Sequence, residues 1–164
     1  MDFNWPAIVG LVSWLWGGVP ADIGNSPQSL LEAIYNPPAT AESTLTADEV
    51  YSDRLQTLFA SYFAEEQTIL ASTAGEPPPI NLIPFDPLSL VTAPGDVSIS
   101  VPVVTGAQAT ATVGFTGEDG PVQLSLFMIE QQDGWRIDDV ASFNANGQQW
   151  LLSWILRYDP PMID

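Results

Sequence analysis

Residues 133–140 (DGWRIDDV) constrain the fold more than any other stretch of this sequence. They follow residues 122–130, where the hydrophobic pattern predicts a β-strand. The Asp-Gly pair suits the positive φ angles of a tight hairpin, so the chain should turn back into a second strand over 135–140. Trp135 and Ile137 lie two apart on that strand and should share its helix-covered face. Residues 122–130 are apolar on both faces over much of their length, so we expect that strand in the centre of an antiparallel sheet.

Two further strands should precede this hairpin. Residues 97–102 alternate between apolar and polar side chains, and Pro102 favours an edge position because it cannot donate to a strand ladder. Residues 108–115 alternate in the same way, which is typical of a half-buried strand. The whole antiparallel sheet should therefore extend over about residues 97–141.

Helices are expected in the sequence both before and after the strands of the sheet. A Ser-Pro pair suits the cap and first position of a helix over 27–35. A capping box (TADE) opens a second helix over 47–72, which the run GEPPP ends. The proline-rich crossing that follows has room for a short helix over 86–89, capped by Asp86. Apolar residues at helical spacing predict a last helix over 148–157.

The length of 164 residues, 46% of them apolar, suits one domain, which we place at residues 22–164. Residues 1–21 form a separate apolar segment. Its run of 12 apolar residues is too short to span a bilayer but has the length of a signal-peptide core. A small-residue cleavage site at 19–21 fits an altered export signal, and with it an exported or periplasmic protein. The missing positive flank favours the alternative, a segment that packs on the domain in a cytoplasmic protein.

The composition excludes several kinds of chemistry. The chain has no cysteine, no histidine and no lysine, so thiolate nucleophiles, histidine bases and Schiff bases are ruled out. The carboxylates do not follow the spacing of a calcium loop. We therefore assign no catalytic residue, no metal and no cofactor.

The net charge of −17 constrains the partners. It disfavours nucleic acid and anionic membrane surfaces, which both need clustered basic residues. Two interpretations of the charge remain open. In the first, the negative charge keeps the protein soluble, as in a salty or acidic medium; in the second, it attracts a basic protein partner.

The order of these segments resembles the cone-shaped α+β superfamily of nuclear transport factor two and the ketosteroid isomerases. It is also similar to a bacterial family of unknown function whose members are often exported. This resemblance implies a curved antiparallel sheet wrapped around helices, with a pocket between them, and a C-terminal helix. The matching pieces are Ser26-Pro27 with Leu30, Leu31 and Tyr35; Phe85-Asp86-Pro87-Leu88; residues 109–113 (ATATV); and residues 134–140 (GWRIDDV).

Aromatic side chains are the candidates for lining such a pocket. They are equally consistent with an ordinary core face at helical spacing. The six candidates are Tyr35, Tyr51, Phe59, Tyr62, Phe115 and Trp135.

Isomerases of the superfamily set a tyrosine and carboxylates around an apolar cavity. The matching acids here are Asp86, Asp138 and Asp139. Asp138 and Asp139 should alternate faces on their strand, so at most one points inward and could act as a base. The alternative is structural: one acid pairs with Arg136 or Arg54, and the other is solvated. Arg136 and Asp138 lie two apart, which favours a bidentate pair between them.

The favoured function is a non-enzymatic, soluble binding domain for a small apolar ligand or a protein partner. The first alternative is an acidic immunity or inhibitor protein directed against a basic toxin or enzyme. The second is a histidine-free isomerase or lyase of the ketosteroid-isomerase type. The sequence predicts no stable membrane span and leaves a homodimer open.

Overall fold

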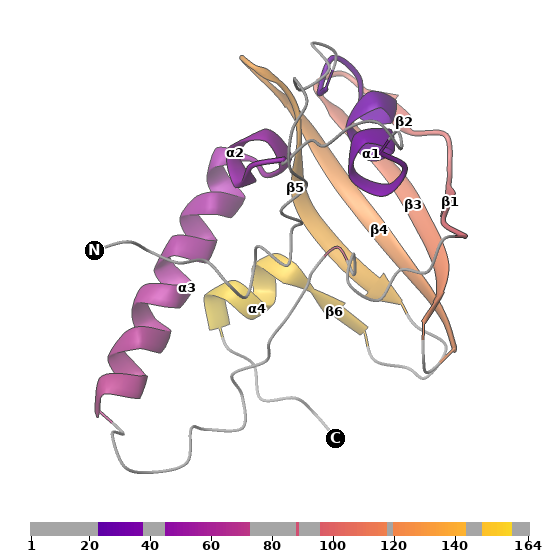
Figure 1. Cartoon of the computed structure of the whole chain (residues 1–164). Coiled ribbons are helices and arrows are strands. Elements are labelled where there is room, and N and C mark those ends of the chain that lie inside the picture. The colour runs from indigo at the N-terminus through magenta and orange to yellow at the C-terminus, as the bar shows by residue number, and fades with distance from the viewer. Residues whose placement is uncertain are drawn as a thin grey trace.

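The computed structural model of this chain describes residues 23–37, 45–72, 88, 96–117, 120–143 and 149–158. Within these ranges the protein is an α+β structure built on a curved antiparallel sheet (Figure 1). The helices are α1 (Pro27–Tyr35), α2 (Ala47–Val50), α3 (Asp53–Ser72) and α4 (Leu152–Tyr158). The strands are β1 (Ser98–Ile99), β2 (Val103–Thr105), β3 (Gln108–Gly117), β4 (Gly120–Gln131), β5 (Gly134–Phe143) and β6 (Gln149–Leu151).

Five of the six described strands follow the order β1-β3-β4-β5-β6, and the sixth, β2, also pairs with β3. The central position expected for residues 122–130 is confirmed, because β4 lies between β3 and β5. The predicted hairpin is confirmed as well. Gln131 pairs with Gly134, which adopts a φ of 116° that favours glycine.

Helix α1 begins and ends as predicted. Ser26 caps it by accepting a hydrogen bond from the backbone N–H of Ser29, and Pro27 occupies its first position. Its apolar side chains are buried, and Figure 1 shows the helix lying across one face of the sheet. Burial of that face, rather than the short helix itself, stabilises the element.

The single helix predicted over 47–72 is wrong in one respect, because the chain breaks it at residues 51 and 52. Tyr51 is extended and forms a parallel bridge with Ile137 of β5. The N–H of Ser52 donates to the carbonyl of Ile137 at 2.8 Å. The helical stripe continues on both sides of the break, so periodicity alone could not reveal it. The break ties the beginning of α3 to the sheet.

The helix predicted over 148–157 is also only partly right. Residues 149–151 form strand β6, in which Trp150 pairs with Ser142 and Leu151 with Ala141 of β5. Helix α4 begins one residue later. This short apolar run pairs with the edge of β5. A run of this length suits either a strand or a helix, so its pattern alone could not decide between them.

The core lies between this sheet and the helices. Trp135 and Ile137 are both buried, as predicted. Residues with no measurable exposure come from every layer: Leu30, Leu31, Val50, Leu55, Val113, Leu124, Leu126, Val140 and Leu152. Leu88 is buried too, but the other residues of the short helix expected at 86–89, with Asp86, and the apolar segment 1–21 lie outside the described residues.

Candidate functional site

Three of the six aromatic candidates lie together where α3 begins. The rings of Tyr51 and Phe59 are 5.2 Å apart between centroids. Phe63 stacks on Phe59 at 6.3 Å and meets Tyr62 edge-on at 5.7 Å. Such tilted, offset and edge-on contacts are those of a packed aromatic core.

The other three candidates lie in other parts of the same hydrophobic core. The hydroxyl of Tyr35 donates to the carbonyl of Leu88 at 3.1 Å. The backbone N–H of Trp135 donates to the carbonyl of Gly24 at 2.7 Å, which holds the β4–β5 hairpin against the residues before α1. Phe115 is buried on β3, next to the sheet edge described below. All six candidates therefore belong to one hydrophobic core or pack against it, and ring contacts through Phe63 connect Tyr51, Phe59 and Tyr62 within it.

The two acids of β5 do not point to opposite faces, contrary to expectation. The register shifts between Phe127 and Met128, so that Asp139 lies opposite Phe127 while Ile137 lies opposite Met128. Asp138 is therefore the extra residue of a β-bulge, which interrupts the alternation of side chains. Both carboxylates reach the same guanidinium: Nη2 of Arg54 lies 3.0 Å from Asp138 and 3.7 Å from Asp139.

Each of the two carboxylates has further partners. The hydroxyl of Ser52 donates to Asp138 at 2.5 Å, and Nη2 of Arg54 also donates to the Asp138 carbonyl. Asp139 accepts from the N–H and the hydroxyl of Ser153, at 3.0 and 2.5 Å. The expectation that one acid is simply solvated is therefore wrong. The hydrogen bond to Asp138 raises the pKa of Arg54, so its charge persists and the cluster links α3, β5 and α4.

The pair predicted between Arg136 and Asp138 is also wrong. Arg136 is 9% exposed and directs its side chain to backbone carbonyls. Its Nε donates to Asp48 at 2.7 Å and its Nη1 to Trp135 at 2.9 Å. The bulge places Asp138 against Arg54, and α2 places the carbonyl of Asp48 within reach of Arg136.

β1 and β2 form one edge of the sheet. Both strands pair with β3, with Ile99 opposite Val113 and Val103 opposite Thr110. The edge has one extra residue between these pairs, so residues 98–105 follow β3 as two short strands joined at a bulge. Ser100 accommodates the bulge: its N–H donates to the Thr112 carbonyl at 2.9 Å, and its hydroxyl accepts from the Thr112 N–H at 2.8 Å.

Three valines on this edge are unusually exposed. Val101 is 84%, Val103 70% and Val104 52% exposed. Residues 97–117 contain no charged side chain, although the protein as a whole carries a charge of −17. Sheet edges are commonly protected by charges and prolines, and here Pro102 and the bulge are the protection present. Sequence reasoning found the edge but missed its exposure, for which the charge-free stretch was the available signal.

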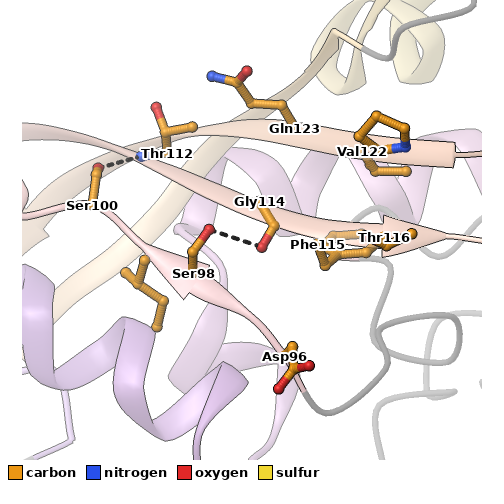
Figure 2. A pocket seen from close by; sticks show the side chains of 11 residues that line it. Asp96, Ser98, Ser100, Thr112, Gly114, Phe115, Thr116, Val122 and Gln123 are labelled. Atoms are coloured by element: carbon orange, nitrogen blue, oxygen red, sulfur yellow. Dashed lines mark hydrogen bonds between the residues drawn. The ribbon is translucent and has the colours of Figure 1, made fainter.

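A cleft of about 780 Å³ adjoins the β1 half of this edge (Figure 2). Its polar lining includes Ser98, whose hydroxyl donates to the Gly114 carbonyl at 3.1 Å, together with Ser100 and Gln123. Asp96 lies beyond the beginning of β1, and it is the charged residue among the described residues of the lining. The described lining offers apolar contact along the edge and a carboxylate at one end.

Among the described residues, no helix is long and apolar enough to cross a membrane. Three or more potential metal-ligating side chains do not gather anywhere in that part of the chain. Comparisons with protein families, with curated proteins and with solved structures gave no match.

Proposed function

We propose that this protein is a non-enzymatic binding domain that receives an extended segment of a partner protein on its β1–β2 edge. The exposure of Val101, Val103 and Val104 on an uncharged edge strand carries the proposal. An extended peptide can add to such an edge through main-chain hydrogen bonds, while side chains on alternate positions contact the neighbouring surface. Burial of the valines would supply the apolar part of the binding energy.

The alternative of an isomerase has less support. That chemistry needs a carboxylate able to reach a substrate, next to a tyrosine in a cavity. Asp138 and Asp139 are held instead by Arg54, Ser52 and Ser153.

We also infer a cone-type arrangement for the fold. The curved antiparallel sheet with α1 across one face supports this interpretation (Figure 1). A pocket for a small apolar ligand inside such a cone remains a prediction. The packed contacts among Tyr51, Phe59 and Phe63 favour the edge as the binding site.

The edge site can be tested with a capped peptide of alternating valine and threonine, titrated into isotopically labelled protein. We expect amide shift changes over residues 98–105 and the facing part of β3. The double variant Val101→Thr, Val103→Thr keeps shape and charge but replaces a methyl group with a hydroxyl at each site, and should bind about ten-fold more weakly. Shift changes elsewhere, or an unaltered affinity in the double variant, would refute the edge site.

Trp154 provides the control for unspecific apolar binding. It is 63% exposed on α4, which follows the strand at the opposite side of the sheet order. A Trp154→Ser variant should bind the peptide as the parent does.

A further inference from the structure

We propose that the partner segment is basic: an extended stretch of a positively charged protein adds to the β1–β2 edge and sets a lysine or arginine beside Asp96. This inference rests on the proposed function and adds the chemistry of the partner.

Charge complementarity selects the partner. The chain carries 20 acids against three arginines, so its field attracts cations over a distance and accelerates their association. Two of these arginines are engaged within the protein. Arg54 contacts Asp138 and Asp139, and Arg136 contacts backbone carbonyls. A second copy of the chain would instead bring together two bodies of charge −17, which repel each other.

The edge strand is uncharged along its length and is preceded by one acidic residue, so a partner strand would meet an apolar surface with a carboxylate at one end. Residues 97–117 are uncharged, so a strand can pack against the valines without removing any carboxylate from water. Asp96 is exposed and comes two residues before β1, at the end of the cleft (Figure 2). A basic side chain that reaches the cleft would meet this carboxylate there and fix the register of the added strand.

The dimensions define the segment. Residues 98–105 span about 27 Å in an extended conformation, which matches a segment of about eight residues. Small side chains such as Ser98 and Ser100 border the cleft and leave room for a long basic side chain. The proposed ligand is therefore an eight-residue strand of alternating apolar and other residues, with a basic residue at the end near Asp96.

Three capped eight-residue peptides test this inference by calorimetric titration: alternating valine and lysine, valine and threonine, and valine and glutamate. The basic peptide should bind about ten-fold more tightly than the neutral one, and the acidic peptide should bind least. A basic peptide with N-methylated backbone amides keeps the charge but cannot extend the sheet. It should bind about ten-fold more weakly than the unmodified basic peptide.

Two isosteric variants locate the charge effect. Asp96→Asn and Asp133→Asn each remove one negative charge, the first at the cleft and the second in the exposed β4–β5 hairpin. Asp96→Asn should weaken the basic peptide about five-fold and leave the neutral peptide unchanged. Asp133→Asn should change the affinity for either peptide by less than about two-fold.

Each contrary result has a definite meaning. Equal affinities for the basic and neutral peptides would overturn the basic partner and leave the edge site standing. An equally tight N-methylated peptide, or equal effects of the two variants, would reduce the binding to diffuse attraction and also overturn it. Failure of all three unmodified peptides would overturn the edge site itself. A dimer of the chain alone that Val101→Thr, Val103→Thr dissociates would identify a second copy as the occupant.

Discussion

Gly134 illustrates how a single residue can be fixed by both conformation and space. Its φ of 116° is strained for other residues, and a Cβ there would lie 2.6 Å from the carbonyl oxygen of Gly24. That carbonyl accepts the N–H of Trp135, so it cannot move without loss of a hydrogen bond. Gly134→Ala should therefore lower the free energy of unfolding by about 3 kcal/mol in urea titrations.

Gly106 is the matched control for this prediction. It also has a positive φ, 62°, but a Cβ there would meet nothing within 4 Å. Gly106→Ala should cost only about 1 kcal/mol, the price of the conformation alone. Equal losses in the two variants would contradict the steric argument.

The charged residues of β5 show where inference from local sequence stops. The sequence offered Arg54 or Arg136 as the partner of one acid and left the other solvated, whereas Arg54 contacts both Asp138 and Asp139. Arg136 contacts backbone carbonyls instead. Side-chain alternation along a strand holds only while the register is regular, and the bulge that disturbs it depends on the neighbouring strand. The residue pattern of 134–140 does not by itself predict that bulge.

At the scale of elements, segments with a cap, proline or glycine signal were predicted correctly, whereas segments that could form either a helix or a strand were not. Helix α1 and the β4–β5 hairpin have a cap, a proline or a glycine at the required position, and both form as expected. Residues 51–52 and 149–151 carry no such signal. Pairing with β5 decides their conformation, and a long-range contact of this kind cannot be read from the pattern of one segment.

Asp139 provides a cap for α4 from a distant strand, and this leads to a prediction for the element. It accepts from the N–H and hydroxyl of Ser153 in the first turn of the helix. Asp139→Ala should destabilise the protein by about 1–2 kcal/mol and accelerate hydrogen exchange of the α4 amides. Asp133→Ala, in the exposed hairpin, should cost less than about 0.5 kcal/mol and leave α4 exchange unchanged. Unaltered α4 exchange in Asp139→Ala would show that the cap is dispensable.

At the scale of the whole molecule, the sequence predicted the fold class and the antiparallel sheet but not the candidate site. The class follows from the number and order of periodic segments. The site depends on which apolar residues stay uncovered once the sheet has formed. Val101 and Val113 look alike in the alternating pattern, yet Val113 is buried and Val101 is 84% exposed. Only the position of each strand in the sheet separates them.

The net charge of −17 leads to the last prediction, on salt and pH. Folding brings the negative charges closer together, and their mutual repulsion opposes it. Acidification reduces the net charge, so the stability should rise as the pH falls from 7 to 5. Salt screens the same repulsion. It also weakens the ion pairs of Arg54, but these are partly exposed and contribute at most about 1 kcal/mol. Because repulsion among many acids outweighs one cluster, added salt should stabilise the protein by about 1 kcal/mol and raise the melting temperature by about 2–4 °C. Thermal unfolding in a salt series at pH 7 and a pH series at constant salt measures both effects. A melting temperature that falls in both series would mean that the Arg54 cluster, rather than the net charge, dominates the electrostatics of this fold.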